Sequence, residues 1–149
     1  MTAAARREVW LFDVDGTIVD SFDAQHLRPL VAELFLALRA SGAIVAVWSA
    51  GGVQHASKVI ARHGLAGHAS GCFDKSLDTD GRWTLPVAVH GEGYAVVCVD
   101  DQPAQLPLGI DRRVVVFPYL TPDPHDRALL AELESVTDSV TDNSRTEMA

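Results

Sequence analysis

Four short apolar runs, separated by longer amphipathic segments, most strongly limit what this chain can fold into. The runs cover residues 8–12, 43–48, 94–99 and 113–117. Their apolar residues are consecutive rather than alternating, which is typical of strands buried on both faces of a parallel sheet. The sequence therefore predicts an α/β, three-layer, Rossmann-like fold with a central, mainly parallel sheet.

The segments between the runs contain helical patterns. One helix is expected between the first two runs, where apolar residues recur with helical spacing at Leu27, Leu30, Val31, Leu34, Phe35 and Leu38. A second is expected after residues 49–52, up to about residue 64, and a third over residues 124–133. We expect one domain over residues 1–134, followed by an acidic tail without regular structure over residues 135–149.

Charge and hydropathy exclude several classes of protein. The formal net charge of −8 argues against strong nonspecific nucleic-acid binding, because such binding requires a clustered basic surface. No apolar run reaches the roughly 18 residues of a membrane span, and the N-terminus lacks the apolar segment of a signal peptide. We therefore expect a cytoplasmic protein without a membrane partner. Cys72 and Cys98 lack the spacing of a metal site and are expected to be reduced.

Polar residues stand where three of the apolar runs end. The first run leads into Asp13 and Asp15, the second into Ser49, and the third into Asp100 and Asp101. Because ligands bind at the carboxyl ends of strands in open α/β sheets, we expect these side chains to converge on one edge of the sheet. Carboxylates brought so close repel one another unless a cation lies between them. A set of hard oxygen ligands favours Mg²⁺.

A carboxylate site with a bound metal suits phosphoryl transfer. One aspartate can act as the nucleophile and form an aspartyl-phosphate, while a second acts as general acid and base. The Ser49 hydroxyl and the backbone N–H of Ala50, at the start of a helix, can hold phosphate oxygens. A lysine would balance the charge, and the chain has only Lys58 and Lys75.

These residues resemble the haloacid dehalogenase (HAD) superfamily of phosphohydrolases. The resemblance rests on the sequence DVDGT after one apolar strand, a serine after a second and two aspartates after a third, and it spans roughly residues 9–118. It implies a phosphatase with Asp13 as nucleophile and Asp15 as general acid and base. It further implies that Mg²⁺ is bound by Asp13, the backbone carbonyl of Asp15 and Asp100, with Asp101 as a further ligand or anchor. Phosphate would be bound by Ser49 and Lys75, with Lys58 as the rival lysine.

The family often inserts a cap domain after the first strand or after the serine. Here each of these connections has room for one helix and little else, so the chain resembles a minimal member with no sizeable cap domain. An open site admits a macromolecular end, or needs a partner to exclude water. The expected substrate is a phosphorylated macromolecule such as a nucleic-acid end or phosphoprotein, or a small phosphate ester.

Two alternatives remain. A catalytically silent HAD-like binding module would keep the fold without the activity. A receiver-type phospho-acceptor domain is also phosphorylated on an aspartate, but it requires a lysine late in the chain, and none follows Lys75.

Several other polar residues are expected to have no role in the site. Residues 78–81 (DTDG) nearly repeat the first motif, but they follow no apolar strand and are expected to form a surface turn. His26 and Arg28 are placed at a solvated helix start, with substrate contact as the weaker alternative. The remaining histidines, His55 among them, are interpreted as ordinary surface or core residues.

Overall fold

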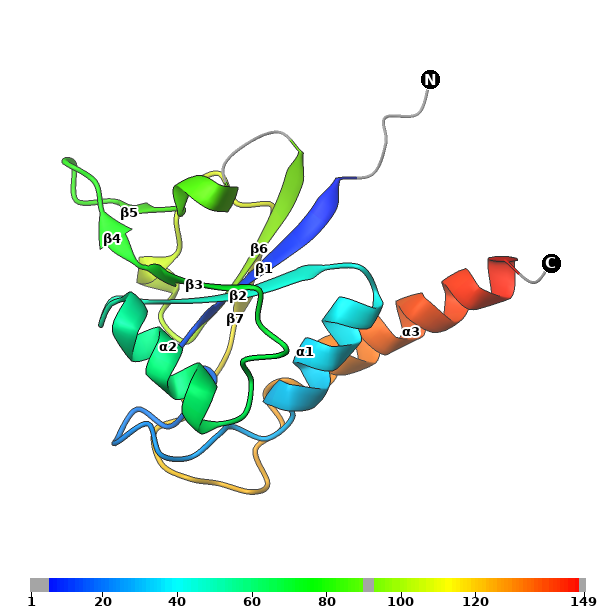
Figure 1. Ribbon diagram of the computed structural model, residues 1–149, viewed down its shortest axis with the longest axis horizontal. Coiled ribbons are helices and arrows are strands. Elements are labelled where there is room, and N and C mark those ends of the chain that lie inside the picture. Colours follow the sequence, from blue (N-terminus) through cyan, green and yellow to red (C-terminus); the bar gives the residue numbers. More distant parts are fainter. Residues whose placement is uncertain (1–5, 90–92, 148–149) are drawn as a thin grey trace.

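The computed structural model describes residues 6–89 and 93–147, which form one central sheet with helices packed against it (Figure 1). The sheet has five parallel strands in the order β3-β2-β1-β6-β7. The strands are β1 (Arg7–Asp13), β2 (Ile44–Ser49), β3 (Gly71–Asp74), β6 (Tyr94–Asp100) and β7 (Arg112–Val115). This confirms the predicted α/β architecture.

Alternate residues of β1, β2, β3 and β6 face two separate hydrophobic cores. On one face, Phe12 of β1 packs with residues of all three helices, which are α1 (Val31–Ala40), α2 (Val53–Arg62) and α3 (Leu130–Glu147). On the other face, Leu11 of β1 packs with the 3₁₀ helix η1 (Val87–Val89) and with Leu106, just after η2 (Pro103–Gln105). The strands are apolar at consecutive positions because both faces are covered.

The C-terminal helix differs from the prediction. It was expected over residues 124–133 with an unstructured tail after it, but α3 begins at Leu130 and runs to Glu147. Leu129, Leu133 and Val136 pack on the core beside α1, with the spacing of one helical face. Polar residues separate these three apolar positions, so their helical spacing was not recognised in the sequence. The last two residues of the predicted tail lie outside the described range, and the position at which the domain ends stays a prediction.

A small hairpin follows β3. It pairs β4 (Ser76–Leu77) with β5 (Trp83–Thr84), and its turn is the DTDG segment. The carboxylate of Asp78 accepts the N–H groups of Asp80 and Arg82 at 2.8 and 2.9 Å, which confirms the predicted surface turn.

The two connections in which the HAD superfamily often inserts a cap domain, after the first strand and after Ser49, are short here. Within the described residues, one helix lies between β1 and β2, and one between β2 and β3, so the structure has no cap domain. None of the described helices is both long enough and apolar enough to cross a membrane.

Candidate active site

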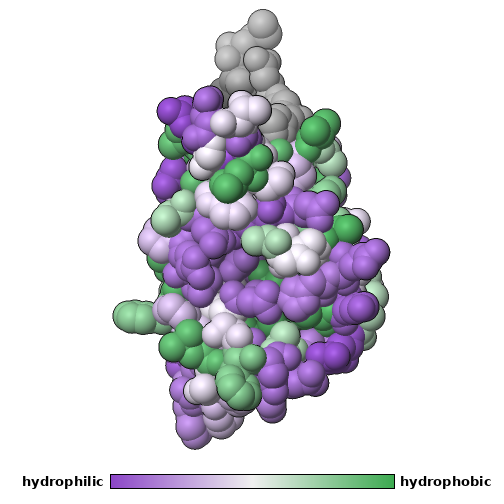
Figure 2. All heavy atoms as spheres, turned by 90° about the vertical axis from the view of Figure 1, so that its left-hand side faces the viewer, coloured by the Kyte–Doolittle hydropathy of each residue, from purple (hydrophilic) through white to green (hydrophobic). Residues whose placement is uncertain are grey.

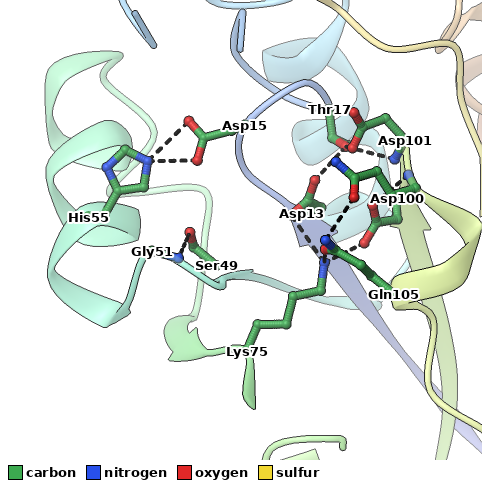
Figure 3. A network of polar contacts seen from close by, with 11 residues as sticks. Asp13, Asp15, Thr17, Ser49, Gly51, His55, Lys75, Asp100, Asp101 and Gln105 are labelled. Carbon is green, nitrogen blue, oxygen red and sulfur yellow. Dashed lines mark hydrogen bonds and ion pairs between the residues drawn. The ribbon is translucent and has the colours of Figure 1, made fainter. Parts of the chain in front are cut away.

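Asp13 and Asp100 lie side by side because they end neighbouring parallel strands, β1 and β6, which pair Phe12 with Val99. Both carboxylates are buried: the side chain of Asp13 is 12 % exposed and that of Asp100 is not exposed at all. Asp101 follows directly, and each of the three residues offers a carboxylate oxygen within 4.8 Å of the others (Figure 3). The structure thus brings together three of the four acidic residues expected at this edge; Asp15 lies apart from them, against His55.

Lys75 is buried between these carboxylates. Its Nζ lies 3.2 Å from Oδ1 of Asp13, 2.5 Å from Oδ2 of Asp100 and 2.9 Å from Oε1 of Gln105. Lys75 directly follows β3, whose last residue, Asp74, pairs with Ser49 at the end of the parallel strand β2. The Lys75 N–H then donates to the Ser49 carbonyl at 2.9 Å. Lys58 is instead exposed on α2.

The acidic cluster carries more negative charge than Lys75 can balance. Burial, and next the neighbouring carboxylate of Asp100, raise the pKa of Asp13 to about 8. Burial also raises the pKa of Asp100, although Lys75 counteracts this. The cluster of Asp13, Asp100 and Asp101 thus contains three carboxylates and, among the residues that the structure describes, only one neighbouring ammonium group, that of Lys75. A cation among them would relieve the repulsion, and a donor set made only of carboxylate oxygens fits Mg²⁺.

The DVDGT loop holds the acidic residues in place. The Thr17 hydroxyl donates to Oδ2 of Asp13 at 3.0 Å and accepts the Asp101 N–H at 3.1 Å, so it ties the two strand ends together. Gly16 has φ = 80°, and a Cβ there would collide with the Asp101 carboxylate. The sequence analysis gave Thr17 no role, although its place four residues after Asp13 was visible.

Arg28 braces this loop from the inside of the protein. Its guanidinium donates to the carbonyls of Gly16, Thr17 and Phe117, at 3.3, 3.2 and 2.5 Å. It also forms two hydrogen bonds with the Asp126 carboxylate, at 2.8 and 3.1 Å. The solvated helix start expected for Arg28 was therefore wrong: its side chain is fully buried, and α1 begins only at Val31.

The predicted phosphate-binding residues lie at the same edge. Strand pairing places Trp48 beside Asp13, so Ser49 ends β2 next to the acidic cluster. The Ser49 hydroxyl is buried and accepts the Gly51 N–H at 3.0 Å, while Ala50 is exposed in the short connection to α2. The N-terminus of α2 therefore follows directly on this edge of the sheet.

Asp15 is more exposed than Asp13, Lys75 and Asp100. Its side chain is 42 % exposed and contacts His55 of α2, whose Nε2 lies 2.9 and 3.1 Å from the two carboxylate oxygens. The interpretation of His55 as an ordinary histidine missed this contact. Figure 3 shows Asp15 turned toward α2, away from Lys75.

Comparisons with known proteins find similarity in the fold and not in the sequence. No family model matches the chain, and no curated protein matches its sequence. Among solved structures, that of DsGPDH of Dunaliella salina is 18 % identical with a TM-score of 0.54; the match covers 76 % of this chain but only 24 % of DsGPDH. A HAD-like hydrolase structure is also 18 % identical, with a TM-score of 0.51, over 93 % of this chain and 83 % of the other. At such identity these likenesses show the fold alone.

Proposed function

We propose that this protein is a Mg²⁺-dependent phosphohydrolase that acts through an aspartyl-phosphate on Asp13. The observation that carries the proposal is the buried contact of Lys75 with Asp13 and Asp100, next to Asp101, at the carboxyl edge of a parallel sheet. The match to a HAD-like hydrolase structure and the DVDGT sequence support it.

Two steps would complete the reaction. A carboxylate oxygen of Asp13 attacks phosphorus, the bond from phosphorus to the leaving oxygen breaks, and Asp15 gives its proton to that oxygen. Water then attacks the phosphorus of the aspartyl-phosphate and gives a proton to Asp15, and Asp13 leaves as a carboxylate. The sum is a phosphate ester and water converted to an alcohol and phosphate.

The surrounding residues fit these steps. The hydrogen bond from Thr17 fixes Asp13, and Lys75 supplies one positive charge beside it. Phosphoryl oxygens would be held by the Ser49 hydroxyl and the Ala50 N–H at the start of α2. Mg²⁺ would be held by Asp13, the backbone carbonyl of Asp15 and Asp100, with Asp101 as a further ligand or anchor. When bound, it supplies the positive charge that this cluster lacks and stabilises negative charge on the phosphoryl group.

The lack of a cap domain in the described residues favours a macromolecular phosphate end as substrate. Phe22 and Phe117 are 81 % and 85 % exposed, on loops tied to the DVDGT segment by backbone hydrogen bonds of Tyr119 with Gly16 and Ser21. On the side of the molecule that carries α2 and the β4–β5 hairpin, hydrophobic and hydrophilic side chains are interspersed (Figure 2). Exposed aromatic rings on loops joined to the DVDGT segment would suit nucleobases or apolar protein residues better than a very small substrate.

A phosphatase screen tests the proposed function. The protein is assayed with p-nitrophenyl phosphate, nucleotides, a phosphopeptide, and oligonucleotides phosphorylated at the 3′ or 5′ end, each with Mg²⁺ and with excess EDTA. We expect hydrolysis of at least one class with Mg²⁺ and its loss with EDTA. Absence of hydrolysis in every class would contradict the proposal and favour a catalytically silent binding module.

A further inference from the structure

We propose that His55 is a positioning residue for Asp15: its Nε2–H holds one carboxylate oxygen so that the other faces the leaving group. This inference rests on the proposed function, because it assigns His55 a part in the proton transfer that Asp15 would perform. His55 belongs neither to the DVDGT motif nor to the cluster of Asp13, Asp100 and Asp101.

The geometry of the pair carries the inference. Both oxygens of Asp15 lie within hydrogen-bond distance of Nε2, at 3.1 and 2.9 Å. The two residues are 40 positions apart in the chain and meet because α2 starts at the carboxyl edge of the sheet (Figure 3). A single N–H facing both oxygens can bond to either one, whichever carries no proton. The contact therefore persists whether Asp15 is about to donate a proton or has just accepted one.

The imidazole ring is itself held in place by the loop that carries Ser49. A Cβ on Gly51 would lie 3.2 Å from Cδ2 of His55 and 3.3 Å from Oγ of Ser49, so the ring packs closely over the glycine backbone. The helix start is fixed as well, since the Asp74 carboxylate accepts the Val53 N–H at 2.6 Å. His55 thus links the general acid to the predicted phosphate-binding loop.

A purely structural role would be small. The side chains of His55 and Asp15 are 34 % and 42 % exposed, and pairs this accessible to water contribute little to stability. Orientation has a larger effect on rate, because misplacing a reacting group by about 1 Å can cost about 100-fold. A carboxylate as exposed as Asp15 would sample several rotamers without a partner. Replacing His55 should therefore change the catalytic rate more than the stability of the protein.

The test compares leaving groups. Values of kcat and KM are measured for the parent, His55→Ala, His55→Gln and the control Lys58→Ala, an exposed residue of the same helix. The p-nitrophenolate of p-nitrophenyl phosphate leaves without protonation. The more basic phenolate of phenyl phosphate depends more on a general acid. For His55→Ala we expect kcat/KM, which reports the step that releases the leaving group, to fall about 10- to 100-fold on phenyl phosphate, with a much smaller change on p-nitrophenyl phosphate. His55→Gln, which retains an N–H donor, should restore part of the loss.

A double-mutant cycle completes the test. In an Asp15→Asn background, His55→Ala should cause no further loss, because its effect acts through Asp15. Equal losses in kcat/KM on both substrates, no loss at all, or an additive loss in the double variant would overturn the inference while leaving the phosphatase assignment intact. A parent protein inactive on every ester would instead overturn the proposed function, and this inference with it.

Discussion

Asp13→Asn should abolish hydrolysis of every phosphate ester that the parent protein turns over, with a loss in kcat of at least about 10⁴-fold. The amide has nearly the same shape and keeps an oxygen for Lys75, which lies 3.2 Å from Oδ1 of Asp13, but it cannot serve as the nucleophile. The fold should persist. Burial raises the pKa of Asp13 to about 8, so a neutral amide avoids a charge that the site disfavours without Mg²⁺.

Asp80→Asn is the matched control for this variant. It makes the same chemical change in the DTDG turn, a nearly identical sequence on an exposed hairpin. We expect unchanged activity from Asp80→Asn, and a thermal midpoint for Asp13→Asn equal to or above that of the parent when Mg²⁺ is absent. An Asp13→Asn protein as active as the parent would show that Asp13 is not the nucleophile.

Asp126→Ala should reduce the free energy of unfolding by about 3 kcal/mol, because it leaves the buried guanidinium of Arg28 without its charged partner. The Asp126 side chain is 16 % exposed, so some water can compensate, and the lower end of the range for broken buried pairs is appropriate. For a chain of this length, such a loss corresponds to a fall of roughly 6–12 °C in the thermal midpoint. Activity should also fall, because Arg28 holds the Gly16 and Thr17 carbonyls.

Chemical denaturation with Glu134→Gln as control measures this effect. Glu134 is an exposed carboxylate on α3, and its neutralisation should change stability by less than about 0.5 kcal/mol. If Asp126→Ala were as stable as the control, the Arg28–Asp126 pair would not brace the DVDGT loop as described.

The sheet and the acidic edge could be predicted because they depend on local sequence. Consecutive apolar residues in residues 8–12 and 94–99 indicated strands buried on both faces, and the next residues in the chain were Asp13 and Asp100. Parallel strands then brought these residues together without further information. The same reasoning separated DVDGT from the DTDG turn, since only the first follows a buried strand.

The remaining contacts join residues that are distant in sequence and carry no periodic signal. The Arg28–Asp126 pair spans 98 residues, and nothing near either residue indicates the other. Lys75 was preferred over Lys58 only through the family resemblance, because which lysine reaches the acidic residues depends on where the short strand β3 ends. Sequence pattern likewise missed the continuation of α3 beyond residue 133, where Val136 lies among serine, threonine and acidic residues.

Trapping the phosphorylated enzyme tests the central claim most directly. The protein is mixed with Mg²⁺ and a substrate found in the screen, quenched in acid within the first turnover, digested and analysed by mass spectrometry. We predict a peptide heavier by one phosphoryl group, with the modification on Asp13, sensitive to hydroxylamine and absent from Asp13→Asn. Rapid turnover with no phosphorylated Asp13 at any quench time, or a phosphoryl group on another residue, would contradict the account.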